Sequence, residues 1–341
     1  MINLKKIIQI LLMSAMFNYS YAQEIEEEET PTFRVSGSVD TYMRHNFSNN
    51  FDAAPGTSFA NLPGFSLGMA NIILAYEGEK SGFVADLVYG PRGTDAVFGS
   101  VGNSSSIINQ MYAYLNVGEK TTITMGNFNT FLGYEVISPV YNFNYSTSYM
   151  FSYGPFSHTG IKLDFIISEN SSLMIGVLNP TDATESNPDD TYMLGFQFSF
   201  SGQYINYLGG KGYSQIDYTG GFNLSESFFF GINATSVSND TPDGGFSGIA
   251  LYPQLTLSDS FSLGLRGEIF SDKKDFTGVF GNASGDANNT SITLTGSYTS
   301  GNMILKPEIR IDSASEKIFA DTSSGASDNL ASFIIAAIYS F

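Results

Sequence analysis

Apolar and polar residues alternate with a period of two along most of the chain. In the segment 290–299, Ile292, Leu294 and Tyr298 fall on one side, and serines and threonines fall on the other. The same alternation recurs in the segments 33–40, 83–89, 161–167, 192–200, 261–269 and 303–313. Successive side chains of a β-strand point to opposite faces, so the pattern predicts a series of strands with one apolar and one polar face each.

The connections between these segments are alternately short and long. Turn residues mark short connections at 81–82, 118–120, 168–170, 201–202, 224–226, 258–259 and 300–301. Longer polar loops are expected near 47–64, 91–106, 132–157, 180–190, 238–245, 272–289 and 314–328. Short turns at one end and long loops at the other are typical of outer-membrane barrels. We therefore predict an all-β fold, a transmembrane antiparallel up-and-down β-barrel of about 16 strands, with 14 or 18 strands as alternatives.

The N-terminal residues predict export. Lys5 and Lys6 precede the apolar segment 7–17, and Ser20-Tyr21-Ala22 supplies the small residues that precede a signal-peptide cleavage point. The apolar segment is too short to span a bilayer as a helix, which takes about 20 residues. We expect a cleaved signal peptide over 1–22, an acidic flexible tail over 23–31 and the barrel over 32–341.

Composition narrows the class of protein further. Only 14% of the residues are charged, whereas about 25% is usual in soluble domains. The chain has no Cys, which excludes disulfides and thiolate metal sites. Its formal charge of −18 disfavours nucleic acid as a partner, because phosphate binding needs clustered Lys and Arg.

An alternating strand pattern also occurs in soluble β-sandwiches. A transmembrane barrel differs from these because its sheet closes on itself and leaves no edge strands. An open sheet of this many strands would leave exposed edges. Within a bilayer, closed barrels and helices are the structures that satisfy every backbone polar group. We therefore expect the apolar faces to contact outer-membrane lipid. Tyrosines near strand ends are candidates for the interfacial girdles of such a barrel, namely Tyr76, Tyr89, Tyr192, Tyr298 and Tyr339.

Charged residues on the polar faces are candidates for the lining of a water-filled lumen. They recur at spacings of two, which places them on one side of a strand where opposite charges can pair across neighbours. The candidates are Arg34, Asp40, Arg44, Lys162, Asp164, Arg266, Glu268, Lys306, Glu308, Arg310 and Asp312. Structural ion pairs that fill a narrow lumen are the alternative for each of them.

The last segment, 329–341, is an amphipathic strand that ends in Phe341. A terminal strand with an aromatic last residue resembles the signal that the barrel-assembly machinery of Gram-negative outer membranes reads. This resemblance implies that machinery as a partner and Phe341 as part of the signal.

Several stretches resemble the β-barrel porin family common in Bacteroidetes. They are GFVADLVYGPRG at 82–93, NYSTSYMFSYGPFSHTGIKLDF at 144–165 and GVLNPTD at 176–182, supported by 35–47 and 65–82. The likeness covers about the first half of the expected mature chain. It implies a location in the outer membrane, and it supplies no catalytic residues.

The loop at 132–157 is unusually rich in aromatic residues. Its candidates for a constriction are Tyr141, Tyr145, Tyr149, Phe151 and Tyr153. So many aromatic side chains would be unfavourable in free solution, and long loops are often functional. We expect this loop to narrow or plug the lumen; capping the barrel from outside and packing on a neighbouring protomer are the alternatives.

No residue pattern predicts an enzyme or a cofactor. His45 and His158 are the two histidines, and neither has a nucleophile on its strand face. Two scattered histidines and the absence of an Asp-rich calcium loop also leave metal chemistry unsupported.

These features together predict a porin of the Gram-negative outer membrane through which small hydrophilic solutes diffuse passively. One alternative is a non-conducting barrel scaffold whose outer loops bind a partner or surface ligand. Another is a substrate-specific nutrient channel. A homotrimer is possible, although no residue in the sequence specifies it.

Overall fold

The computed structural model describes residues 31–48, 51–187, 189–281 and 285–341. The predicted signal peptide, 1–22, and nearly all of the predicted acidic tail, 23–31, lie outside the described residues. Among the described residues, no helix is long and apolar enough to cross a bilayer.

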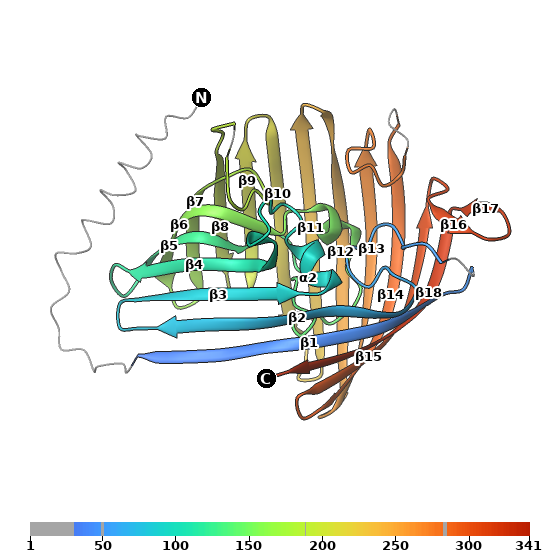
Figure 1. Cartoon of the computed structure of the whole chain (residues 1–341), viewed down its shortest axis with the longest axis horizontal. Helices are drawn as coiled ribbons and strands as arrows, with labels where there is room; N and C mark the ends of the chain where they lie inside the picture. Colours follow the sequence, from blue (N-terminus) through green and yellow to red (C-terminus); the bar gives the residue numbers. More distant parts are fainter. Residues whose placement is uncertain (1–30, 49–50, 188, 282–284) are drawn as a thin grey trace.

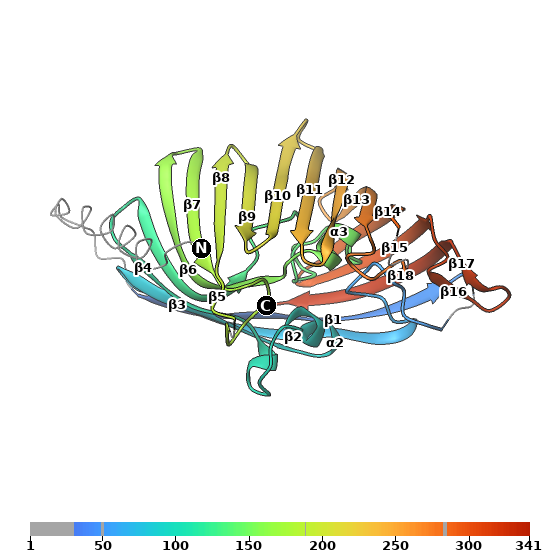
Figure 2. The ribbon, with the colours of Figure 1, turned by 90° about the horizontal axis from the view of Figure 1, so that it is seen from above.

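Sixteen antiparallel strands close into one barrel, in which neighbours along the chain are neighbours in the sheet (Figures 1 and 2). The strands are β1 (Thr32–Asn46), β2 (Gly64–Glu77), β3 (Ser81–Tyr89), β4 (Ile108–Asn116), β5 (Thr121–Asn129), β6 (Ser157–Ser168), β7 (Ser171–Leu178), β8 (Met193–Phe200), β9 (Gln203–Gly210), β10 (Tyr213–Asn223), β11 (Phe228–Asp240), β12 (Asp243–Ser258), β13 (Phe261–Lys273), β14 (Ala287–Ser300), β15 (Met303–Ala314) and β18 (Asn329–Ser340). The barrel closes where β1 pairs with β18, with Ser38 opposite Ser340. The predicted fold and strand number are confirmed.

The loops contain the remaining elements. These are α2 (Pro91–Ala96), the 3-10 helix η1 (Ser105–Ile107), α3 (Tyr149–Tyr153), β16 (Phe319–Asp321) and β17 (Gly325–Ser327). The hairpin of β16 and β17 projects from the rim of the barrel (Figures 1 and 2).

Burial follows the predicted alternation. On β14, Ile292 and Leu294 are about half exposed on the outer face, whereas Thr293 and Thr295 are fully buried inside. The last strand departs from the pattern, because its inward side chains Ile334, Ala336 and Ile338 are apolar and buried as well. They pack against the loops inside the barrel, so a lumen-facing position does not have to be polar.

Two connections at the end of the barrel that carries the long loops are tight turns. The loop predicted at 238–245 is wrong, because β11 runs to Asp240 and β12 begins at Asp243, which leaves only Thr241 and Pro242 between them. β9 and β10 are likewise joined through Lys211 and Gly212. The residues around 238–245 are polar because a strand that extends beyond the membrane meets water on both faces, and such a strand resembles a loop in sequence.

A register shift between β1 and β2 directs one carboxylate into the barrel. The shift lies between Val39 and Thr41, and the carboxylate of Asp40 accepts a hydrogen bond from the Met69 N–H at 2.8 Å. Asp40 lies over Gly68, where a Cβ atom would come within 1.8 Å of a carboxylate oxygen. Glycine is therefore required at this point for Asp40 to reach the interior.

Candidate functional site

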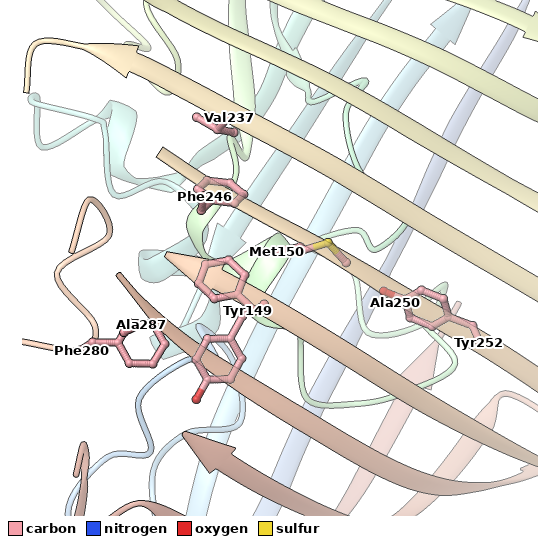
Figure 3. Close-up of a cluster of buried hydrophobic side chains, with 9 residues drawn as sticks. Tyr149, Met150, Val237, Phe246, Ala250, Tyr252, Phe280 and Ala287 are labelled. Carbon is pink, nitrogen blue, oxygen red and sulfur yellow. The ribbon is translucent and has the colours of Figure 1, made fainter. Parts of the chain in front are cut away.

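The connection between β5 and β6, residues 130–156, folds into the barrel, and we call it the inner loop. Its α3 helix lies toward the wall formed by β11–β14 (Figure 2). Figure 3 shows Tyr149 and Met150 of α3 in one buried cluster with Phe246 and Ala250 of β12. The Tyr149 ring centre lies 5.4 Å from that of Phe270 on β13. Locally, the Ser148 hydroxyl caps α3 by accepting a hydrogen bond from the Phe151 N–H at 3.1 Å.

Two carboxylates of the barrel wall bind backbone N–H groups of the inner loop. Glu268 accepts hydrogen bonds from Tyr149 N and Met150 N, both at 2.9 Å. Glu308 accepts from Tyr145 N at 2.8 Å, from Ser146 N at 3.2 Å and from the Ser146 hydroxyl. The N–H groups in the first turn of a helix and in the irregular backbone before it have no backbone acceptors of their own. The two wall carboxylates supply these acceptors and so fix the inner loop in place.

Basic side chains of the same wall bind the carbonyl groups of the inner loop. Arg266 donates to Ser146 O at 2.6 Å and forms a 2.6 Å ion pair with Glu135. Arg310 donates to Thr147 O at 2.7 Å, and Lys306 donates to Pro139 O at 2.9 Å. The wall carboxylates therefore accept from N–H groups of the inner loop, and the wall cations donate to its carbonyl groups.

Strand β1 and the loops β1–β2 and β3–β4 join this arrangement from the other side. Tyr145 donates its hydroxyl to Asp40, and burial and that carboxylate raise the tyrosine pKa, so the hydroxyl stays protonated. Arg44 donates to Ala60 O at 3.0 Å in the β1–β2 loop. Arg92 of α2 donates to Ile137 O at 2.9 Å, and its guanidinium lies 4.4 Å from the ring centre of Phe59.

Buried charges of both signs meet in this arrangement. The basic members are Arg44, Arg92, Arg266, Lys306 and Arg310, and the acidic members are Asp40, Glu135, Glu268, Glu308 and Asp312. Each of them is at most 5% exposed. Buried charges are tolerated when they are paired and hydrogen-bonded, and the opposite charges of this set provide that compensation. Three further buried acids, Asp86, Asp217 and Asp272, are held by amide, hydroxyl or backbone donors instead.

Eight of the predicted lumen residues belong to this buried set. Seven of them contact a loop, and Asp312 instead pairs with Arg310 at 2.9 Å. The eight are Asp40, Arg44, Arg266, Glu268, Lys306, Glu308, Arg310 and Asp312. They do face the interior, as the alternation of their strands requires. The strand pattern cannot reveal that a loop from a distant part of the chain occupies the space in front of them.

The other predicted residues lie elsewhere. Arg34 is exposed at the end of the barrel that carries the termini, where it pairs with Glu77 at 3.4 Å. Of the predicted constriction residues, Tyr141 is 78% exposed and does not belong to the packed part of the inner loop. Phe151 stacks on Phe156 with 4.8 Å between ring centres, and Tyr153 lies 5.9 Å from the ring centre of Phe270.

A cavity of about 360 Å³ remains beside the opposite wall, between the inner loop and β4–β8. Lys162 and Asp164 line it and form an ion pair at 2.6 Å, with side chains 23% and 38% exposed. Two further cavities against the inner loop have about 10 Å³ each, roughly the space of one water. The inner loop is therefore packed closely on one side of the lumen, and the open volume lies on the other. We call the larger space the side cavity.

Residues that we did not select from the sequence also matter here. Asp86 accepts hydrogen bonds from Asn71 at 3.0 Å and Asn109 at 2.7 Å. Asp217 accepts from Asn206 at 2.8 Å and from Gly133 N of the inner loop at 3.0 Å. The available signal is a lone acid on the polar face of a strand with amides on the neighbouring strands, and a pattern of charge pairs does not include it.

His158 is fully buried, and its Nε2 lies 2.9 Å from the Thr130 hydroxyl. Within the described residues, no three His, Asp or Glu side chains are grouped so that they could hold a metal ion.

Comparison with solved structures gives the same architecture at low sequence identity. The anion-selective porin from Comamonas acidovorans superposes with a TM-score of 0.61 at 12% identity, covering 92% of this chain and all of that one. The outer membrane channel DcaP of Acinetobacter baumannii gives 0.60 at 12%, covering 94% and 100%. The trimer form of OmpT from Vibrio cholerae gives 0.58 at 11%, covering 92% and 100%. At this identity the likeness shows the fold.

A comparison with curated protein sequences gives no match. A family model, by contrast, matches residues 32–341, which is the whole of the barrel. The chain therefore belongs to the outer-membrane family described as "Putative beta-barrel porin-2, OmpL-like".

Proposed function

We propose that this outer-membrane porin conducts small hydrophilic solutes by passive diffusion, and that the inner loop sets the width of its path. The observation that carries the proposal is the asymmetric filling of the lumen. The inner loop is fixed to the β12–β15 wall by buried charges, and the side cavity of about 360 Å³ stays open beside β4–β8.

The lining of the side cavity suits hydrated solutes. Amide and hydroxyl groups of Gln110, Thr124 and Gln197 border it, together with the Lys162–Asp164 pair. A pore selects by its width and by the polar groups that face it. Of the lumen candidates predicted from the sequence, we assign selectivity to Lys162 and Asp164, and we assign fixation of the loop to the eight buried residues.

Other parts of the proposal concern assembly. We propose a homotrimer, as the trimer form of OmpT from Vibrio cholerae illustrates for this fold. We also propose export by the segment 1–22, contact of the apolar faces with outer-membrane lipid, and recognition of Phe341 by the barrel-assembly machinery. We propose no enzymatic role, and the Bacteroidetes likeness stays a prediction.

Planar-bilayer recording of the purified mature protein tests the function. Stable stepwise currents are expected, and deletion of 141–153 should raise the conductance because it empties the loop side of the lumen. A matched deletion of 321–325, in the β16–β17 hairpin at the rim, should leave it unchanged. Absence of steps from well-folded protein would favour the non-conducting scaffold, and saturable solute flux would favour a specific nutrient channel. An unchanged conductance after deletion of 141–153 would refute the role of the inner loop.

A further inference from the structure

We propose that the side cavity is a binding site for neutral polyhydroxylated solutes, with a monosaccharide ring as the unit that it holds. This inference rests on the proposed function and deepens it, because it names the class of solute that pauses in the path. Its volume of about 360 Å³ lies within the usual range for small-molecule sites.

Aromatic side chains supply one part of the site. Tyr112 and Tyr114 face the cavity from β4, and Phe128 and Phe131 face it from the end of β5 and the start of the inner loop. Phe131 is held in place by His158, with 5.0 Å between ring centres. The C–H groups on one face of a sugar ring pack well on such rigid aromatic surfaces.

Two glutamines supply oriented polar groups. Gln197 donates its amide N–H to Phe131 O at 3.0 Å and to Asn206 at 2.9 Å, which turns its carbonyl oxygen away from these partners. Gln110 accepts from Asn129 N at 3.1 Å, which leaves its NH₂ group to donate. In the described part of the chain, Gln197 Oε1 and Gln110 Nε2 have no protein partner. One fixed acceptor and one fixed donor therefore border the same space, and hydroxyl groups can pair with both.

The charges at the site cancel. Lys162 and Asp164 line the cavity 2.6 Å apart, and the Lys162 ammonium lies 5.5 Å from the ring centre of Phe128. A charged solute would have to compete with this pair, since each charge already has a partner. A neutral solute can donate to Asp164 and accept from Lys162 without separating them. The compensated lining therefore favours neutral solutes over ions of similar size.

Saturation-transfer NMR with the full-length mature protein in detergent micelles tests the proposal without requiring a current. The probes are glucose, glucuronate and glucosamine, which share ring size and differ in charge. We expect glucose to bind at least as tightly as either charged sugar. Tyr112→Leu should weaken glucose binding about tenfold, by loss of the aromatic face. The matched control is Tyr207→Leu, which alters a tyrosine 40% exposed on the outer face of β9 and should leave binding unchanged.

The outcomes separate this inference from the proposed function. Tyr112→Phe keeps the ring and serves as the second variant if Tyr112→Leu does not fold; it should retain most of the glucose binding. Glucose that does not bind, or that binds equally to Tyr112→Leu and wild type, overturns the inference even if the bilayer currents are normal. Tighter binding of glucuronate or of glucosamine than of glucose overturns the argument from charge balance. Glucose binding without any current overturns the channel and leaves the site.

Discussion

Glu308→Ala is the sharpest perturbation of the inner loop, because one carboxylate holds four donors. Glu308 accepts hydrogen bonds from Tyr145 N, from Ser146 N, from the Ser146 hydroxyl and from the Thr295 hydroxyl. The side chain is 1% exposed, so water does not replace these contacts in the native state. The substitution removes the acceptor and leaves two backbone N–H groups of the loop without partners.

The expected loss follows from the number of these bonds. A hydrogen bond to a charged group contributes about 1.5–3 kcal/mol. Bonds that share one acceptor are not additive, so the docking of the inner loop should weaken by about 3–6 kcal/mol in all. The strand ladders are untouched, and we therefore expect the loop to detach while the barrel stays closed.

Single-channel recording and limited proteolysis measure this release. Glu308→Ala should show a higher mean conductance with frequent transitions between levels, and chymotrypsin should cut at the aromatic residues of 130–156. The matched control is Glu119→Ala, which removes an exposed carboxylate from the turn between β4 and β5. If Glu308→Ala keeps the conductance and the protease resistance of wild type, the wall charges do not fix the loop, and the reasoning fails.

Three further predictions concern other parts of the molecule. Burial raises the pKa of Asp182 to about 6 from an ordinary 3.8. The folded protein therefore holds this proton more tightly than the unfolded chain does. The unfolding free energy should fall by about 3 kcal/mol as the pH rises from about 4 to 6, and it should remain lower above that. Asp182→Asn should flatten that part of the profile in urea titrations, and an unaltered slope would contradict the assignment. Lys162→Met leaves Asp164 unpaired beside the side cavity. The cation-to-anion permeability ratio, measured from reversal potentials, should therefore rise about fivefold at low salt and less at high salt. A fall in this ratio would refute the placement of the pair on the path. Phe341→Ser should lower the amount of assembled barrel in the outer membrane and leave refolding in detergent intact, and equal losses in both would show a structural role only.

The alternation of residue types determined the barrel. Polar Thr293 and apolar Leu294 are adjacent in the sequence, and adjacent residues of a strand point to opposite faces. The same reasoning located most of the turns and the inward direction of Arg266, Glu268 and Arg310. It failed at 238–245, because polar residues describe contact with water and do not distinguish a loop from a strand that extends beyond the membrane.

What fills the barrel was decided by tertiary structure. The sequence indicated an aromatic-rich loop at 132–157 and charges on β13 and β15. It did not indicate which loop residues meet which of these charges. Glu308 and Tyr145 are 163 positions apart and meet only because the barrel has closed and the loop has turned inward. The side cavity arises in the same way, since it is the volume that the inner loop leaves free. Strand faces follow from local periodicity, whereas the packing of a loop against a distant wall depends on how all sixteen strands close, and no local pattern encodes that.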